Sequence, residues 1–345
     1  MKNSINFSQI CDDLLKNLSP RQKEVVERRF GLKSGSGETL EAIGKSHNIT
    51  RERVRQIERD SFEKMKPKVK KYQNAFNYLV SSVKRYGGLK KEDTLLLELA
   101  SERNHPKANL LLALHDQFSR IPDNPEFYPL WTTDKNSLKL AKKVNNFITS
   151  KLKEQGKAMP FSKVFEFCKK SALSKENNLN SQNVLSFVEV SKKIEQGMNN
   201  LFGLKDWPEI NPKGIKDRAF LVLQKEQKPI HFTNIASLIP KLPFIENFER
   251  RVVPQTVHNE LIKDPRFVLV GRGMYALKEW GYEPGVVKDI IKKVMKDKGK
   301  PMTKKEIMRE TLKQRMVKES TVALNLQNNP TFIKNTEGKY TLRKI

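Results

Sequence analysis

The sequence predicts a mainly α-helical protein, in which a helix-turn-helix is followed by tandem winged helix-turn-helix modules with small β-hairpin wings. Two observations predict this fold class. Three capped helical segments, with a tight turn between the last two, occupy residues 18–66, and one sequence frame recurs four times along the rest of the chain. The last two copies of the frame end in alternating apolar and polar residues, which is typical of a β-hairpin.

The N-terminal stretch contains three helical segments, and each has its own start signal. Ser19 and Pro20 open the first helix, Thr39 precedes the second and Thr50 precedes the third, because hydroxyl side chains are preferred N-caps. The sequence KSGSGE forms a loop between the first two helices. Asn48, in the short turn SHNI, suits a left-handed backbone. This is the spacing of a helix-turn-helix whose last helix enters the major groove of DNA.

The repeated frame predicts tandem copies of one supersecondary unit. The copies align on four apolar positions spaced 70, 71 and 72 residues apart: Leu89, Met159, Ile230 and Met302. Each copy reads as an amphipathic helix, a short extended piece, two further helices and a closing hairpin. The hairpin is clear in RFVLVGRGMYALKEW and TFIKNTEGKYTLRKI. In the first two copies, FYPLWTTDKN and FGLKDWPEI keep an aromatic closing element, but we expect no clean second strand there.

Short breaks such as NPKG and YEPG divide the chain into five predicted domains. The domains are a helix-turn-helix at 1–67, a degenerate winged-helix module at 68–136, a winged-helix module at 137–212, a further winged helix at 213–284 and a C-terminal winged-helix module at 285–345.

The net charge of +27 over 345 residues points to a polyanionic partner, either nucleic acid or an acidic protein surface. The alternative is that the charge serves solubility alone. Residues 1–70 hold 16 Lys and Arg against 10 Asp and Glu, so they carry +6 and the remainder carries +21. No single basic tail explains the charge, which favours the first interpretation.

Other residue types exclude several classes of protein. The two cysteines, Cys11 and Cys168, lie far apart and have no histidine at metal-ligand spacing, so we expect reduced thiols and no metal site. No apolar run approaches the roughly eighteen residues of a membrane span, and the N-terminus lacks a secretory signal. We therefore expect no membrane partner and a cytoplasmic, nucleoid-associated location.

The third helical segment, TRERVRQIERD and the residues after it, has two distinct faces. The inward face should pack on the first two helices and contains Val54, Ile57, Ser61 or Phe62, and Met65. The outward strip contains Arg51, Glu52, Arg55, Gln56 and Arg59. Two arginine pairs in this strip lie four residues apart, and each costs roughly 0.2–0.5 kcal/mol in an isolated helix. A solvated surface is the alternative, but an anionic partner explains such a strip better.

The residue types of the outward strip also match the edges of DNA bases. Arginine can bridge guanine O6 and N7, glutamine can pair with adenine, and glutamate can accept from cytosine N4. We therefore predict that Arg51, Glu52, Arg55 and Gln56 read bases.

The motifs ERRFGL, ETLEAIGKSHNITRERVRQIE and FEKMK, in this order, resemble region four of bacterial primary-type sigma factors over about fifty residues. The resemblance implies recognition of the minus-thirty-five promoter element by Arg51, Glu52, Arg55 and Gln56, and docking on the flap of RNA polymerase. It also implies contacts of Arg29, Thr39 and Leu40 to the DNA backbone, and we add Arg53, Arg59 and Lys66 as further backbone candidates. Asp60 stands where family members usually carry a basic residue, and nothing downstream resembles the other sigma regions. We expect a regulator other than a complete sigma factor.

A second resemblance lies in the third copy of the frame. DRAFLVLQKEQKPIHFTNIASLI and RFVLVGRGMYALKEW are similar to the HARE-type winged helix shared with the delta subunit of bacterial RNA polymerase. The acidic tail of the delta family is not matched, since the last 59 residues hold 16 Lys and Arg against 6 Asp and Glu. We expect the helix after Pro254 to expose Gln255, His258 and Asn259 toward a groove, and Arg272 at the hairpin tip to reach phosphate. The alternative is that this module binds protein.

No motif indicates an enzyme: P-loop, dinucleotide fingerprint, HExxH and nucleophile elbow are all lacking, and we expect neither a cofactor nor a small-molecule substrate. The leading hypothesis is a sequence-specific DNA-binding protein of bacterial transcription that binds double-stranded, promoter-like DNA and contacts RNA polymerase. An alternative is a polymerase-binding adaptor with non-specific DNA contacts. A weaker alternative is the specificity component of a nuclease or DNA-modification system.

Overall fold

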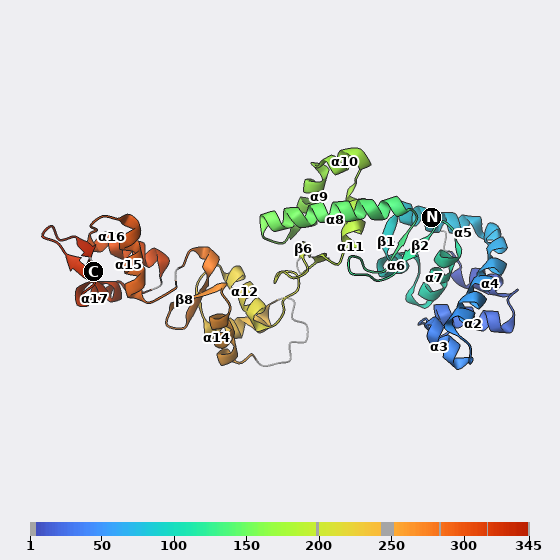
Figure 1. Cartoon of the computed structure of the whole chain (residues 1–345), viewed down its shortest axis with the longest axis horizontal. Coiled ribbons are helices and arrows are strands. Elements are labelled where there is room, and N and C mark those ends of the chain that lie inside the picture. The colour runs from blue at the N-terminus through green and yellow to red at the C-terminus, as the bar shows by residue number, and fades with distance from the viewer. Residues whose placement is uncertain (1–4, 198–199, 243–251, 283, 316, 344–345) are drawn as a thin grey trace. The chain divides into compact units, whose positions relative to one another are not determined.

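The computed structural model describes residues 5–197, 200–242, 252–282, 284–315 and 317–343, and it is mainly α-helical with small antiparallel sheets (Figure 1). The predicted fold class is confirmed. The chain divides into two compact units, Met1–Lys205 and Asp206–Ile345. Within the described ranges, no helix combines the length and apolar character needed to cross a membrane.

The N-terminal helices begin where the sequence predicts them. The four helices are α1 (Phe7–Leu15), α2 (Pro20–Phe30), α3 (Leu40–Ser46) and α4 (Arg51–Val69). The side chains of Ser19, Thr39 and Thr50 each accept a hydrogen bond from the backbone N–H three residues later. Asn48 adopts a φ of 52°, which is the predicted left-handed conformation between α3 and α4. The start of each of these three helices is therefore fixed by a local hydrogen bond.

Gly31 ends α2 in a left-handed conformation, with φ 68°, and the following loop passes very close to it. A Cβ atom at this position would lie 2.4 Å from the carbonyl carbon of Ser36. We expect Gly31→Ala to lower the free energy of unfolding by about 1–3 kcal/mol, because both the backbone conformation and the close approach are incompatible with a side chain. Gly35→Ala is the control, since φ is 83° there but no atom lies within 4 Å of the added Cβ. Equal losses of thermal stability in the two variants would contradict the role of the close approach.

After α4 and a short 3-10 helix (Lys70–Tyr72) comes the first copy of the repeated frame, called the second module below. Its elements are α5 (Gln73–Lys84), β1 (Leu89–Lys91), α6 (Glu92–Leu99), α7 (His105–Leu114), β2 (Ser119–Ile121) and β3 (Leu130–Thr132). The three strands form an antiparallel sheet in the order β1-β3-β2. The third module contains α8 (Lys135–Gln155), β4 (Met159–Pro160), α9 (Phe161–Lys169), α10 (Ala172–Asn177), α11 (Ser181–Glu189), β5 (Ile194–Gln196) and β6 (Leu201–Leu204), with strand order β4-β6-β5.

The expectation that the first two copies lack a clean second strand is wrong. That strand exists in both, as β2 and β5, and it lies upstream of the aromatic run rather than within it. Each is only three residues long, so alternation alone could not reveal it. The loop between β2 and β3 is ordered by Asn124, whose side chain accepts hydrogen bonds of 3.0 Å from the backbone N–H groups of Glu126 and Phe127.

The second unit, Asp206–Ile345, contains the third and fourth copies of the repeated frame, whose elements are called the fourth and fifth modules below. The fourth contains α12 (Ile215–Glu226), β7 (Ile230–His231), α13 (Phe232–Leu238), α14 (Pro254–Lys263), β8 (Phe267–Gly271) and β9 (Met274–Leu277), with strand order β7-β9-β8. The fifth contains α15 (Val287–Lys298), α16 (Lys304–Gln314), α17 (Glu319–Asn328), β10 (Phe332–Lys334) and β11 (Tyr340–Leu342). Both predicted hairpins, β8–β9 and β10–β11, are confirmed.

The four positions that define the sequence repeat occupy one structural position. Each pairs with the closing strand of its own module: Leu89 with Thr132, Met159 with Phe202, Ile230 with Tyr275 and Met302 with Tyr340. The repeat therefore reflects one shared strand pairing, in which the short extended piece after the first helix joins the hairpin.

The helix-turn-helix and the second module share one hydrophobic core in the first unit. Side chains of α1 and Met65 of α4 pack in the same cluster as residues of α5, α6 and α7 and Trp131 of β3. Helix α4 passes through residue 67, where the sequence places a domain boundary, and ends at Val69. The shared core holds α4 against the second module, and this determines the surroundings of its charged side chains.

Candidate nucleic-acid interface

The two faces of α4 are sorted as the periodicity predicts. Val54 and Ile57 are buried with Val25 of α2 and Ile43 of α3, so they fix α4 on the helices that precede it. The opposite face carries the outward strip. Arg51, Glu52, Arg55 and Arg59 are exposed, and Gln56 is partly buried.

Glu52 and Arg55 form a bidentate ion pair within the outward strip. The guanidinium donates hydrogen bonds of 2.8 and 2.6 Å to the two carboxylate oxygens. These hydrogen bonds lower the pKa of Glu52 and raise the pKa of Arg55, so both groups stay charged at neutral pH. Arg51 and Arg59 also lower the pKa of Glu52. Glu52 thus offsets the repulsion between the arginines that the sequence predicts.

The other side chains of the outward strip differ in how free they are. Gln56 accepts a hydrogen bond of 3.0 Å from Arg53, which leaves its amide nitrogen available as a donor. Within the described part of the chain, Arg51 and Arg59 form no hydrogen bond or ion pair. Two guanidinium groups are therefore ready to bind an anion without breaking an internal contact.

The residues predicted to contact the DNA backbone differ in whether they already have a partner within the protein. Thr39 is exposed as the N-cap of α3, and Leu40 is half-buried beside the core of the helix-turn-helix. Arg29 is engaged internally, because it donates a 2.9 Å hydrogen bond to the carbonyl oxygen of Glu38 and lies 3.4 Å from a carboxylate oxygen of Glu58. Burial raises the pKa of Glu58, and Arg29 opposes this shift.

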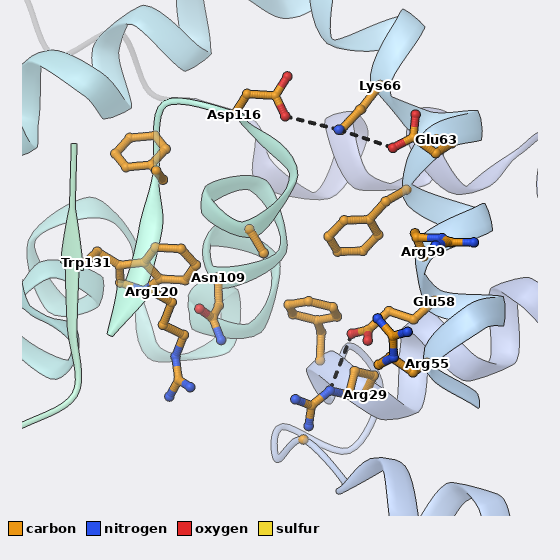
Figure 2. A pocket seen from close by; sticks show the side chains of 15 residues that line it. Arg29, Arg55, Glu58, Arg59, Glu63, Lys66, Asn109, Asp116, Arg120 and Trp131 are labelled. Atoms are coloured by element: carbon orange, nitrogen blue, oxygen red, sulfur yellow. Dashed lines mark ion pairs between the residues drawn. The ribbon is translucent and has the colours of Figure 1, made fainter. Parts of the chain in front are cut away.

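Lys66 faces the second module. Its ammonium group lies 3.2 Å from Glu63 and 3.1 Å from Asp116, so it links α4 to the segment after α7 (Figure 2). It would have to leave both carboxylates in order to reach a phosphate. The sequence around Lys66 does not indicate the ion pair with Asp116, because Asp116 is fifty residues away.

Arg28, which received no role from the sequence, ties the helix-turn-helix together. It donates hydrogen bonds of 2.9 and 2.7 Å to Glu38 and one of 2.7 Å to the hydroxyl of Ser46. These contacts join α2 to the loop before α3 and to the end of α3. Arg28 therefore helps to orient the pair of helices that presents the outward strip.

In the fourth module, the expectation that His258 is exposed is wrong. Its ring is half-buried, with its centroid 4.7 Å from that of Phe232 and 5.8 Å from that of Tyr275. Leu261, which lies three residues further along α14 and is buried, marks the same side of the helix as core-facing. Gln255 and Asn259 are exposed and joined by a 3.2 Å hydrogen bond, and Arg272 is exposed at the tip of the β8–β9 hairpin.

No group of three or more potential metal-binding side chains occurs among the described residues. Cys11 and Cys168 are free and buried, and burial raises the pKa of each thiol to about 12. Neither thiol is a reactive nucleophile in this state.

The comparison with protein families matches residues 14–66 to the family described as "Sigma-70, region 4". RNA polymerase sigma factor SigA of Clostridium acetobutylicum is 47% identical over 63 residues, which cover 17% of this chain and 17% of that protein. The principal sigma factor HrdD of Streptomyces coelicolor is 41% identical over 59 residues, covering 17% of this chain and 18% of that protein. RNA polymerase sigma factor sigB of Arabidopsis thaliana is 42% identical over 73 residues, covering 21% and 13%.

The chain thus spans less than a fifth of the length of these relatives. Over this stretch, the resemblance to sigma region four that the sequence predicts is confirmed. The match contains α2, α3 and most of α4, and therefore the whole outward strip. It supports a DNA-binding, transcription-related role for this part of the chain.

Proposed function

We propose that the chain is a sequence-specific DNA-binding protein of bacterial transcription, which reads a promoter-like site in double-stranded DNA and contacts RNA polymerase. The observation that carries this proposal is the outward strip: arginine, glutamine and glutamate side chains lie exposed on α4, opposite Val54 and Ile57. This helix follows a capped helix and a tight turn, as a major-groove recognition helix does. The match of residues 14–66 to sigma region four supports both partners.

Within this proposal, the residues of α4 take different roles. Arg51, Arg55 and Gln56 reach base edges directly. Glu52 either holds Arg55 in a defined orientation or releases it and accepts a hydrogen bond from cytosine N4. Arg53 and Arg59, together with Thr39 and Leu40 at the start of α3, contact the DNA backbone. Arg29 and Lys66 contribute there only after they release Glu58 and Asp116. Binding of chromosomal DNA would place the protein in the cytoplasm, on the nucleoid.

We propose that the remaining chain forms winged-helix modules at 68–136, 137–212, 213–284 and 285–345, after a helix-turn-helix at 1–67. The module at 213–284 is of the HARE type, similar to the polymerase delta subunit. Its element order of helix, strand, two helices and hairpin supports this proposal. Gln255, Asn259 and Arg272 are its candidate DNA contacts, and His258 lies behind them against Phe232.

The second candidate function is that of a polymerase-binding adaptor with non-specific DNA contacts. It is favoured by exposed apolar side chains on the fourth module: Val253 is 50% exposed, Ile262 63% and Leu269 43%. Such side chains suit a protein partner better than a phosphate backbone. Copurification with RNA polymerase after nuclease treatment, without enrichment of any DNA sequence, would favour this function.

Unbiased selection of DNA from a random pool tests the leading proposal. At a fixed salt concentration near 0.15 M, we expect enrichment of one short motif, because the outward strip can discriminate each contacted base pair by about 1–3 kcal/mol. Affinity for the selected site should fall with salt, with a slope of about −5 on logarithmic axes if roughly six phosphates are contacted. A bound pool with no enriched motif, together with the same salt slope, would contradict sequence-specific reading.

A further inference from the structure

A pocket of about 690 Å³ lies between the helix-turn-helix and the second module, within the first unit (Figure 2). One wall is made by α2, the loop after it and α4, and the other by α7, the segment after it, β2 and β3. Its volume falls in the range of pockets for small molecules, roughly 300–1,000 Å³. The shared core of the two modules holds both walls in place.

The charges that line the pocket favour an anion. The cationic residues are Arg29, Arg55, Arg59, Lys66 and Arg120, and the acidic residues are Glu58, Glu63 and Asp116. Lys66 is occupied by Glu63 and Asp116 at one end, and Arg29 pairs with Glu58 (Figure 2).

The remaining guanidinium groups form no ion pair or hydrogen bond with a carboxylate of the lining. Arg120 binds Glu92, and Arg55 binds Glu52, and both of these carboxylates lie outside the pocket. Arg59 forms no ion pair within the described ranges. The ion pairs of Arg55 and Arg120 use the Nε and Nη2 atoms of each guanidinium, so the donors on Nη1 remain for a phosphate or carboxylate in the pocket.

Aromatic rings and unpaired polar atoms complete the pocket. Phe30 and Phe62 stack at 5.9 Å on one wall, and Phe118 meets Trp131 edge-on at 6.4 Å on the other. Trp131 is 2% exposed, and its Nε1 has no hydrogen-bond partner among the described residues. The Oδ1 atom of Asn109 is buried and unpaired as well, and its side chain projects from α7 between the two walls (Figure 2). Buried polar groups are rarely left unpaired, so an unpaired donor and an unpaired acceptor in the lining of one pocket indicate a missing partner.

We propose that this pocket binds a small anion that carries a planar aromatic ring, called the planar anion below; the ring lies between the aromatic walls and the anionic group is held by Arg120 and Arg55. Two sources share this chemistry, nucleoside monophosphates and aromatic carboxylates. The edge of a heteroaromatic ring offers the donor and acceptor that Asn109 and Trp131 lack. Arg55 and Arg59 belong both to the pocket and to the outward strip, so the ligand competes with DNA for them. This linkage rests on the proposed function, whereas ligand binding does not.

The test is isothermal titration calorimetry of the full chain with nucleoside monophosphates, with indole-5-carboxylate and benzimidazole-5-carboxylate, and with inorganic phosphate and the free nucleosides. At least one planar anion should bind and raise the melting temperature, whereas phosphate alone and the uncharged nucleosides should bind at least about tenfold more weakly. Binding by nucleotides only, or by carboxylates only, identifies the source. If no planar anion binds, or if phosphate binds equally well, the proposal is overturned.

Two variants and a matched control locate the site. Arg120→Gln should weaken binding by about tenfold or more, because a charge-assisted contact is lost. Asn109→Leu should also weaken binding and leave the fold intact, since the replaced oxygen has no partner in the free protein. Arg85→Gln is the control: Arg85 forms a similar surface ion pair, with Glu98, and lies outside the pocket. Equal affinity in all three variants would overturn the assignment.

DNA binding measured with and without the planar anion separates the two proposals. We expect the anion to lower DNA affinity in the wild-type protein and to have little effect in Arg120→Gln. DNA binding without any anion binding removes the pocket proposal alone. Anion binding without any DNA binding removes the proposed function and leaves the pocket proposal standing.

Discussion

Replacement of Arg51 by alanine is expected to abolish the preference for one or two base pairs of the bound site. Affinity for the selected sequence should fall by about 1–3 kcal/mol, and affinity for unrelated DNA should fall much less. Arg51 is exposed in the first turn of α4, and the described residues give it no internal partner, so the variant loses no contact that supports the fold. It even loses a positive charge that opposes the helix dipole, which should leave stability unchanged or slightly higher.

The measurement is affinity for the selected site and for each of its single-base-pair variants, at one salt concentration. Lys84→Ala removes an equal charge from the exposed face of α5, outside the helix-turn-helix, and serves as the control. It should weaken binding little, and equally for all sequences. If Arg51→Ala lowers affinity uniformly across the site variants, Arg51 contacts phosphate, and the assignment of the outward strip to base reading fails.

Gln56 is a second residue for comparing the selected site with its variants, and its carbonyl oxygen already accepts a hydrogen bond from Arg53. Bidentate pairing with adenine uses both the oxygen and the nitrogen of the amide. Because an amide oxygen has two lone pairs, Gln56 can accept from adenine while Arg53 still donates to it. Arg53 thus holds the amide of Gln56 in a defined orientation through one hydrogen bond.

The helix-turn-helix could be predicted from sequence because its signals act over very short distances. The caps formed by Ser19, Thr39 and Thr50 each involve a partner three residues away. The buried and exposed faces of α4 follow from the 3.6-residue period of the helix. The exposure of Arg51 and Arg55 could therefore be predicted from the local sequence.

The surroundings of the outward strip could not be predicted, because they depend on contacts between distant segments. From the sequence alone, Lys66 is one more basic residue of a recognition helix. Only the fold places Asp116 beside it. Arg120 and Asn109 carry no motif, and only the packing of the second module against α4 makes them part of a pocket. Strand β2 is similarly dependent on context, since three residues become a strand through pairing with β3.

In the second unit, Arg266→Ala is expected to have the largest effect on stability. Arg266 donates hydrogen bonds of 2.8 Å to Asp217 and 2.6 Å to Asp264, and these carboxylates are only 12% and 10% exposed. The guanidinium also lies over the rings of Phe220 and Phe267, at 5.1 and 5.7 Å. Its removal leaves two largely buried carboxylates without their cation, which should cost about 3 kcal/mol.

Hydrogen exchange followed by mass spectrometry localises this effect in the full chain. Peptides from α14, β8 and β9 should exchange faster in Arg266→Ala at neutral pH, whereas peptides from the first unit should not change. Arg272→Ala is the matched control, because Arg272 belongs to the same hairpin but is exposed at its tip. We expect its exchange to equal that of the wild-type protein, within about 0.5 kcal/mol. Similar protection in the two variants would show that the Arg266 network contributes little.

The pH dependence separates the electrostatic part of this loss from the packing part. Hydrogen bonds from Arg266 lower the pKa of Asp264, so the folded state holds this carboxylate in its charged form more strongly than the unfolded state does. The resulting stability is present above the unfolded pKa, near 3.9, and is lost as the pH falls through the lower folded value. The stability difference between the wild-type protein and Arg266→Ala should therefore be largest at neutral pH and should have shrunk clearly below about pH 4. The contacts of Arg266 with Phe220 and Phe267 persist when Asp264 is protonated, so any difference that remains at low pH measures packing. A difference that stays constant down to pH 3 would mean that packing alone accounts for the role of Arg266.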